Sequence, residues 1–233
     1  MTIELKSPIS ALDLRHTRDR WAFAARERAR IDRHWHDLAA ANPALWNGQV
    51  LMCHSVALAD GLLTGRFLTT DFASFVAWRD WGWPDRTVRN CFGSPVVLSS
   101  DGALVYGRMS LRTLNPGGVY PPGGSLEPLD VEPDGTVNVQ GSIERELEEE
   151  TGLKASEAEA GDWIAIFDEQ RLSLARAYRF DLTASAIAER VNRHLARSAE
   201  EELDGIEIIR SVSQIDSRMP PYAAQIVRHF LSR

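Results

Sequence analysis

The sequence predicts an α+β fold on two observations. Two pairs of apolar stretches are each joined by an Asp-Gly dipeptide, Asp60-Gly61 and Asp101-Gly102, which favours the tight turn of a β-hairpin. Segments 16–41 and 222–231 carry apolar residues at the spacing of an amphipathic helix, and 139–151 is predicted to be a helix between a cap at Asn138 and Gly152. The chain is therefore expected to combine β-hairpins with helices.

Length and composition bound the class of protein. The chain has 233 residues, of which 44% are hydrophobic and 25% charged. These values are typical of one large or two small folded domains and exclude disordered, collagen-like and coiled-coil chains. Acidic residues outnumber basic ones by 33 to 26, which gives a net charge of −7. This balance argues against a general nucleic-acid binder and suits a site for a cation.

Cysteine content and hydropathy indicate the compartment. Cys53 and Cys91 are too few and too far apart for a zinc cluster or a disulfide framework, so both are expected to be free, buried thiols. The opening residues, MTIELKSPIS, lack the apolar core of a signal peptide, and no stretch approaches the about 18 to 20 apolar residues of a membrane span. We expect a cytoplasmic protein that binds neither a membrane nor a nucleic acid.

Residues 1–90 are predicted to form an N-terminal extension with a helix and a small antiparallel β unit. The expected elements are a helix at 16–41 ended by Asn42-Pro43, strands at 49–58 and 62–68, and a short helix capped by Thr70 or Asp71 that runs through Trp81. The arginines of the first helix are expected to form ion pairs on a solvated face.

Residues 91–233 are predicted to form the main domain. The expected elements are strands at 95–98 and 103–108, a helix at 139–151 capped by Asn138 and ended by Gly152, strands at 163–167 and 172–182, a helix at 185–196, a strand at 206–212 and a helix at 222–231. Within 115–124, two Gly-Gly pairs and three prolines force an irregular backbone.

Three glutamates share one face of the helix predicted at 139–151. At about 100° per residue, Glu146, Glu149 and Glu150 fall within an arc of about 100°, whereas Glu148 points the other way. Clustered carboxylates repel one another unless a hard cation lies among them, and oxygen ligands suit Mg²⁺ or Mn²⁺. Such a cation bridges phosphate oxygens and helps to deprotonate an attacking water. The alternative interpretation is a solvated acidic helix face.

The surrounding sequence favours the metal-site interpretation. Residues 145–153 read Arg-Glu-Leu-Glu-Glu-Glu-Thr-Gly-Leu and match the second half of the Nudix box, R-E-U-x-E-E-x-G-U with U an aliphatic residue, at every fixed position. Upstream, Pro122-Gly123-Gly124 follows a predicted hairpin and resembles the P-G-G that opens the box. The chain therefore resembles a Nudix hydrolase, specifically over 123–153 and more loosely over 95–231.

The resemblance implies a fold, an activity and a site. The family has an α/β/α sandwich with a mixed sheet, and its members hydrolyse a nucleoside diphosphate linked to another moiety with Mg²⁺ or Mn²⁺. Glu146, Glu149 and Glu150 occupy the positions of the family's metal ligands and of its water-activating glutamate. Gly124 lies where a backbone carbonyl often completes the metal shell, and Arg145 lies where a structural arginine orients the box glutamates.

The box departs from the family pattern between its two halves. The family places the arginine fourteen residues after the second glycine, whereas Arg145 follows Gly124 by twenty-one residues, so seven are inserted. Counting forward from Gly124 and backward from Arg145 then gives different positions for the first box glutamate. The candidates are Asp130, Val137 and the neighbouring Glu127 and Glu132, or none of them. In the family this glutamate mainly holds the arginine, and an insertion here could shape the substrate pocket.

Three short features resemble Nudix members that cleave UDP-sugars. They are the N-terminal extension with a strand that starts at Trp46-Asn47-Gly48, the enlarged loop after P-G-G, and the pair Glu127-Pro128. ADP-ribose and a coenzyme A diphosphate stay open as substrates beside a UDP-sugar.

The extension, residues 1–90, could have either of two roles. It could supply a nucleoside-binding wall in which Trp78, Trp81 or Trp83 stacks on a base, although these tryptophans could also be buried core residues. It could also build the partner surface of a homodimer, since family members are often dimers.

Further candidates lie outside the box. Arg108 and Arg112 precede the glycine pairs, where a guanidinium could clamp a diphosphate or form a surface ion pair. Glu200 to Glu202 and Asp204 fall where many Nudix enzymes place a further acidic residue. The six histidines show no ligand cluster and no nucleophile motif is present, so water is the expected nucleophile.

The sequence thus predicts a Nudix pyrophosphohydrolase that acts on a small nucleotide with Mg²⁺ or Mn²⁺. The predicted residues are Arg145, Glu146, Glu149 and Glu150 for catalysis, Arg108 and Arg112 for substrate, and Gly124 with the three glutamates for the metal. One alternative is a catalytically silent Nudix domain that senses a nucleotide. A second alternative is an interaction module with an incidental acidic helix.

Overall fold

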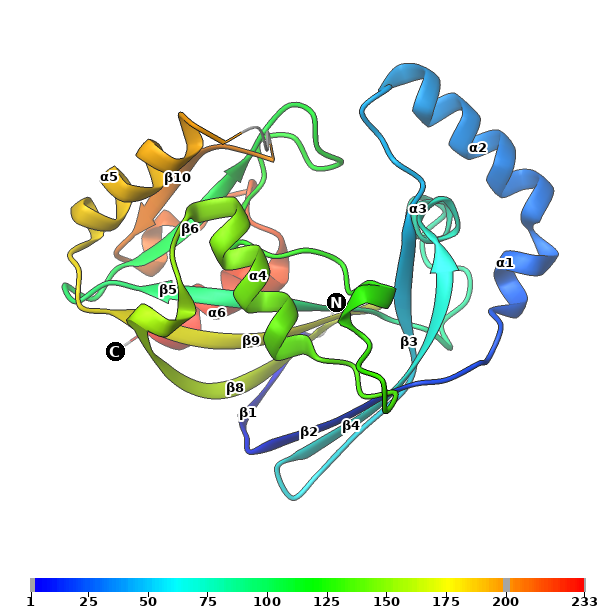
Figure 1. Ribbon diagram of the computed structural model, residues 1–233, viewed down its shortest axis with the longest axis horizontal. Helices are drawn as coiled ribbons and strands as arrows, with labels where there is room; N and C mark the ends of the chain where they lie inside the picture. Colours follow the sequence, from blue (N-terminus) through cyan, green and yellow to red (C-terminus); the bar gives the residue numbers. More distant parts are fainter. Residues whose placement is uncertain (1–2, 199–201, 233) are drawn as a thin grey trace.

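The computed structural model describes residues 3–198 and 202–232, which form two β-sheets surrounded by helices (Figure 1). The strands of the main sheet are β1 (Ile3–Ile9), β5 (Asn90–Leu98), β6 (Leu104–Met109), β7 (Val119–Tyr120), β8 (Ala158–Asp168), β9 (Arg171–Phe180) and β10 (Leu203–Ile209). Their order is β1-β8-β9-β5-β6-β10, with β7 paired to β6. The pair β5 and β9 is parallel and the other pairs are antiparallel, so the sheet is mixed.

Helices cover both faces of the main sheet. The helices α4 (Val139–Thr151) and α5 (Ala184–Leu195) lie on one face, and α6 (Pro221–Leu231) lies on the other (Figure 1). Neighbouring residues of β5 point to opposite sides, because Val97 belongs to the apolar cluster of α4 and α5 and Val96 to that of α6. The predicted α+β fold with an α/β/α sandwich and a mixed sheet is confirmed.

The second sheet has the order β2-β4-β3 and lies beside the first. Its strands are β2 (Ala11–His16), β3 (Gln49–Ala59) and β4 (Leu62–Asp71), and its helices are α1 (Ala22–Arg26), α2 (Arg28–Ala41) and α3 (Phe72–Asp80). The predicted hairpin of β3 and β4 is confirmed, and it turns at Asp60-Gly61, where both residues have positive φ. Asp71 caps α3 by accepting a hydrogen bond from the Ser74 amide at 2.9 Å.

The N-terminal prediction was wrong in two respects. The helix expected at 16–41 begins only at Ala22 and is interrupted at Glu27, and His16 ends the strand β2 instead. Strands β1 and β2 were not predicted, because their ladder partners lie far away in the sequence: β1 pairs with β8 and β2 runs parallel to β4. Long-range pairing leaves little trace in local sequence patterns.

The strand predicted at 206–212 is also displaced, since β10 runs from Leu203 to Ile209. The residues after it turn instead of continuing, because the Arg210 amide donates to the Gln214 side chain at 2.7 Å and Val212–Gln214 forms a 3-10 helix. The remaining predicted elements are present within a few residues. The helix predicted at 139–151 has the same bounds in the structure.

The N-terminal extension and the main domain share contacts that fix their relative position. Strand β1 is the edge strand of the main sheet, and the Val137 amide donates to the Leu14 carbonyl at 2.9 Å. Side chains of both sheets, among them Leu51, Phe67 and Leu147, belong to one buried cluster. The inserted residues of the box therefore pack against the extension. A boundary near residue 90 stays a prediction.

Both cysteines are buried and free, as predicted. Burial raises the pKa of the Cys53 thiol to about 11, so the group is an unreactive thiol at neutral pH. In the described part of the chain, no helix is both long and apolar enough to cross a membrane.

Candidate active site

Helix α4 carries the three predicted carboxylates and is held at both ends by local signals in the sequence. The Asn138 side chain accepts a hydrogen bond from the Gly141 amide at 2.8 Å, which caps the first turn. Gly152 ends the helix in the left-handed conformation, with φ of 67°. Ile143 and Leu147 are fully buried in the cluster beneath α4, so the other side of the helix faces a cavity.

The three predicted glutamates differ in their exposure to solvent. Glu150 is only 6% exposed, Glu146 is mostly buried, and the Glu149 side chain is 52% exposed. The Gly123 amide donates to Glu150 Oε1 at 2.9 Å, whereas Glu150 Oε2 is buried and has no hydrogen-bond partner among the described residues. An unpartnered buried carboxylate oxygen is costly, which indicates that a ligand completes this site.

Glu148 lies outside this group, as the helical geometry predicted. Its carboxylate pairs with Lys154 at 3.2 Å and both side chains are exposed. It therefore provides a matched control for the three glutamates that face the cavity.

Gly124 brings the P-G-G segment against the helix. A Cβ atom at this position would lie 2.8 Å from Glu146 Oε2 and 2.9 Å from Oε1, closer than real Cβ contacts. Glycine lets the backbone approach the carboxylate this closely without displacing it. The structure thus brings Gly123 and Gly124 together with Glu146 and Glu150, which lie more than twenty residues later in the sequence.

The electrostatic environment of the carboxylates favours the binding of a cation. Burial, together with the neighbouring carboxylates Glu202 and Glu149, raises the pKa of Glu146 to about 7. Burial is also the main cause that raises the pKa of Glu150 to about 8. A divalent cation among them would favour the ionised carboxylates, which burial and mutual repulsion disfavour.

Among the candidates for the first box glutamate, Asp130 is the one that pairs with Arg145. Its Nη1 atom donates to Asp130 Oδ1 at 2.7 Å, and the Asp130 side chain is almost completely buried. Asp130 Oδ2 accepts a further hydrogen bond from the Glu127 amide at 2.9 Å.

The other candidates have different contacts. Glu132 accepts from the Asn138 side chain at 2.7 Å, and Val137 is a core residue. Glu127 lines the cavity in front of α4. Asp130 is therefore the arginine's partner despite the insertion.

The residues present fit a hard divalent cation. In the described residues, no group of three or more His, Cys, Asp or Glu side chains is already arranged as a metal cage. The side chains of the described cavity lining that can ligate a metal nevertheless all offer oxygen, since they are glutamates and Ser125 and include neither His nor Cys. Oxygen is the ligand type that Mg²⁺ and Mn²⁺ prefer. We therefore treat Glu146, Glu149, Glu150 and the Gly124 carbonyl as the candidate ligands.

Two adjoining cavities meet at this site. The acidic cavity, of about 480 Å³, is lined by Glu127, Arg145, Glu146, Glu149, Glu150, Glu202, Trp46, Leu129 and others. The aromatic cavity, of about 380 Å³, is lined among others by Phe75, Arg79, Trp83, Asn90, Phe92, Asn115, Tyr120, Arg171, Arg218 and Tyr222. Phe72, Gly124 and Ser125 line both, so the cavities are continuous at the P-G-G segment.

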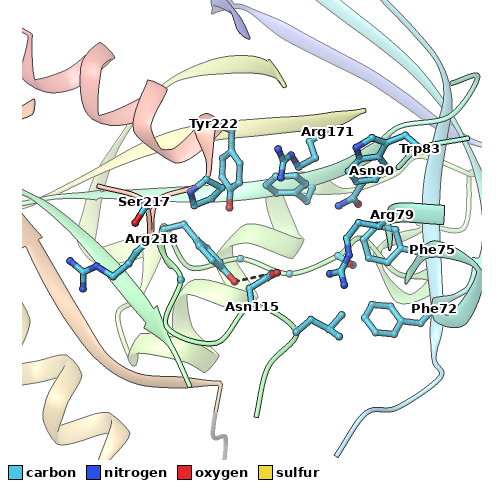
Figure 2. Close-up of a pocket in the computed structure, with 18 residues that line it drawn as sticks. Phe72, Phe75, Arg79, Trp83, Asn90, Asn115, Arg171, Ser217, Arg218 and Tyr222 are labelled. Carbon is cyan, nitrogen blue, oxygen red and sulfur yellow. Dashed lines mark hydrogen bonds between the residues drawn. The ribbon is translucent and has the colours of Figure 1, made fainter. Parts of the chain in front are cut away.

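The aromatic cavity is built from segments that are distant in the sequence (Figure 2). Phe72, Phe75 and Arg79 extend from α3 on one side, while Ser217, Arg218 and Tyr222 lie on the other. Sequence reasoning did not identify the arginines of this cavity, because none of them belongs to a motif. Only the fold brings them together.

The predicted substrate arginines lie elsewhere. Arg108 Nε pairs with Asp204 at 2.5 Å across β6 and β10, and Arg112 lies in the exposed loop that follows β6. Neither lines the acidic or the aromatic cavity. Their role in binding substrate stays a prediction.

The predicted tryptophans and acidic residues also differ in whether they line a cavity. Trp78 is fully buried in the core and the half-buried Trp81 packs against Phe23, whereas Trp83 lines the aromatic cavity. Glu202 lines the acidic cavity. Glu200 and Glu201 lie outside the described residues.

Of the known proteins compared with this chain, only solved structures are similar to it. No family model matches the chain, and no curated protein does. A protein from Deinococcus radiodurans is 16% identical with a TM-score of 0.44, over 61% of this chain and 83% of its own. A MutT NUDIX hydrolase from Burkholderia pseudomallei is 17% identical with a TM-score of 0.39, over 61% and 98%.

A third solved structure is larger than this chain. It is a bifunctional NMN adenylyltransferase/ADP ribose pyrophosphatase from Francisella tularensis, complexed with AMP and a Mn ion, which is 19% identical with a TM-score of 0.44. The match covers 68% of this chain and 45% of that one. For the present chain, the α/β/α sandwich rests on its own sheet order, and the site rests on the contact between α4 and the P-G-G segment.

Proposed function

We propose that this chain is a Nudix pyrophosphohydrolase that cleaves the phosphoric anhydride bond of a nucleoside diphosphate linked to another moiety, of the UDP-sugar or ADP-ribose type. One observation carries the proposal: Glu150, held by the Gly123 amide, keeps a buried oxygen that has no hydrogen-bond partner among residues 3–198 and 202–232, in a cavity that Glu146 and Glu149 also line. A solvated acidic helix face would not bury its carboxylates.

Glu146, Glu149, Glu150 and the Gly124 carbonyl would hold Mg²⁺ or Mn²⁺. When bound, the cation would neutralise phosphate oxygens and acidify a water molecule. Glu149 is the most exposed of the three carboxylates and is the candidate to accept the proton of the attacking water. Arg145, fixed by Asp130, keeps the carboxylates of α4 in place, and its Nη2 atom lies 3.3 Å from Glu146 Oε1.

The two cavities suit the two ends of such a substrate. The diphosphate would lie in the acidic cavity, near the shared Gly124 and Ser125. The nucleoside would enter the aromatic cavity, where Phe75 and Trp83 offer ring faces and Arg79 offers hydrogen-bond donors. With the diphosphate near these shared residues, the aromatic cavity on one side and the rest of the acidic cavity on the other favour a substrate with a group at both ends.

The test is phosphate-coupled turnover of the purified protein with UDP-sugars, ADP-ribose, dinucleoside polyphosphates and coenzyme A, with and without Mg²⁺ or Mn²⁺. Glu150→Gln should lower turnover by at least about a hundredfold. Glu148→Gln is the matched control, because its carboxylate faces Lys154 and solvent. Metal-dependent nucleotide binding without turnover would instead favour a silent sensor domain.

A further inference from the structure

Trp46 is an unusual residue at the mouth of the acidic cavity. It is 81% exposed, and the cavity that it lines also contains Leu129, which is 63% exposed. Trp46 lies in the segment between α2 and β3, while Leu129 lies in the 3-10 helix Pro128–Asp130. Two large apolar side chains are thus presented to solvent beside the carboxylates of α4, where burial against a ligand would be favourable.

The segment that carries Trp46 is anchored. The Asn47 side chain accepts a hydrogen bond from the Ala73 amide at 2.8 Å, and the Gly48 carbonyl accepts one from the Phe72 amide at 2.8 Å. The indole lies against Gly48, because a Cβ atom there would be 3.1 Å from both Cδ1 and Nε1 of Trp46. The exposed ring is therefore held on a fixed backbone, which lowers the entropic cost of binding a ligand.

The surroundings of Trp46 favour a hydroxylated ring. Glu127 and Glu202 line the same cavity, and carboxylates accept hydrogen bonds from hydroxyl groups. An aromatic face next to such acceptors suits a ring that has apolar C–H groups on one face and hydroxyls at its edge. The aromatic cavity differs, because arginines and asparagines line it and none of its described lining residues is Asp or Glu.

We propose that Trp46 is a specificity-determining residue that stacks on the sugar ring attached to the second phosphate, with Leu129 packing at the same ring. The inference rests on the proposed function, in that it places the diphosphate at the carboxylates of α4. It assigns the substrate class to nucleoside diphosphate sugars and gives the N-terminal extension a direct part in binding them.

The experiment measures binding, so that it does not depend on turnover. The probes are the non-hydrolysable α,β-methylene analogues of UDP-glucose and of UDP, titrated calorimetrically in Mg²⁺ into the full chain. Trp46→Ala should weaken binding of the sugar nucleotide about tenfold and that of the UDP analogue less than about twofold. Trp46→Phe, which keeps a ring, should restore most of the loss.

The matched control is Leu111→Ala, because Leu111 is 83% exposed and lines neither cavity. It should change neither affinity. Equal losses for both probes, no loss for either, or a wild-type protein that does not bind the sugar nucleotide more tightly than UDP would overturn the inference. Hydrolysis assays with Mg²⁺ test the proposed function separately, since a silent sensor would still show the sugar preference.

Discussion

Arg145 Nη1 lies 2.7 Å from Oδ1 of Asp130, a buried carboxylate fifteen residues earlier in the chain. The seven residues inserted into the box therefore leave the arginine with an acidic partner. Because Asp130 ends a short 3-10 helix that follows the P-G-G segment, this ion pair ties the first half of the box to α4. It also orients Arg145 toward Glu146 and Glu149.

Asp130→Asn should loosen this arrangement. The variant keeps the shape of the side chain but removes the charge opposite Arg145, so the free energy of unfolding should fall by about 1–3 kcal/mol. Urea denaturation measures this loss, and kcat should fall with it because the carboxylates of α4 lose their support. Glu132→Gln is the control, since Gln can still accept from the Asn138 side chain. Unchanged stability and turnover in Asp130→Asn would show that the ion pair has no positioning role.

Stability should depend on pH through Glu146 and Glu150. Burial raises their pKa values to about 7 and about 8, above the ordinary value of 4.5, so the folded protein retains protons that the unfolded chain releases. The stability that this provides is fully present below about pH 4.5 and is lost as pH rises through 7 to 8. Thermal unfolding of the metal-free protein should therefore show a falling Tm between pH 5 and 8, because the folded state binds more protons than the unfolded chain in this range.

Glu150→Gln should flatten this pH dependence, because the amide does not titrate. The Tm of the variant should equal or exceed that of the wild type at pH 8 in the absence of metal, while turnover is lost. Mg²⁺ should raise the Tm of the wild type more at pH 8 than at pH 5, since it binds the ionised carboxylates. A metal-free Tm that rises steadily from pH 5 to 8 in the wild type would contradict the assignment.

Gly124→Ala should damage the site more than the fold. The added Cβ atom would meet the Glu146 carboxylate at 2.8–2.9 Å, which must displace either the carboxylate or the P-G-G backbone. Turnover should fall by at least about tenfold, with a loss of unfolding free energy below about 2 kcal/mol.

The control for this variant is Gly161→Ala in β8, where the nearest atom to an added Cβ is the methyl group of Ala177 at 3.3 Å. Its turnover should stay close to that of the wild type. Steady-state kinetics and urea denaturation of both variants distinguish the outcomes. Wild-type kinetics in Gly124→Ala would show that catalysis does not require a glycine at this position.

The box helix could be predicted from the sequence because its signals are local. Asn138 caps its start, Gly152 ends it, and the spacing of Glu146, Glu149 and Glu150 sets the face they share. Asp130 could not be assigned in the same way, since counting along the chain does not show how an insertion folds. The structure decides through a contact, the ion pair with Arg145.

The aromatic cavity could not be predicted from the sequence for a different reason. Arg79 lies on α3, Arg171 at the start of β9 and Arg218 before α6, so they meet only when the two sheets and α6 are assembled. Arg108 was predicted from its proximity in sequence to the glycine pairs, but its side chain reaches Asp204 on the neighbouring strand. Closeness to the glycine pairs in the sequence therefore did not place Arg108 in a cavity.

Arg79→Gln and Arg108→Gln separate these two predictions. Arg79 extends from α3 into the aromatic cavity, with its Nε donating to Asp80 Oδ1 at 2.9 Å, so the guanidinium is oriented before substrate binds (Figure 2). If the nucleoside binds there, Arg79→Gln should raise KM about tenfold with little change in kcat, the pattern of a lost contact made equally in the ground and transition states. Arg108→Gln should leave both constants near those of the wild type, because its partner is Asp204 and it lines neither cavity. Initial-rate kinetics of both variants with one substrate measure these constants. A raised KM in Arg108→Gln but not in Arg79→Gln would instead place the nucleoside site beside the strand that carries Arg108.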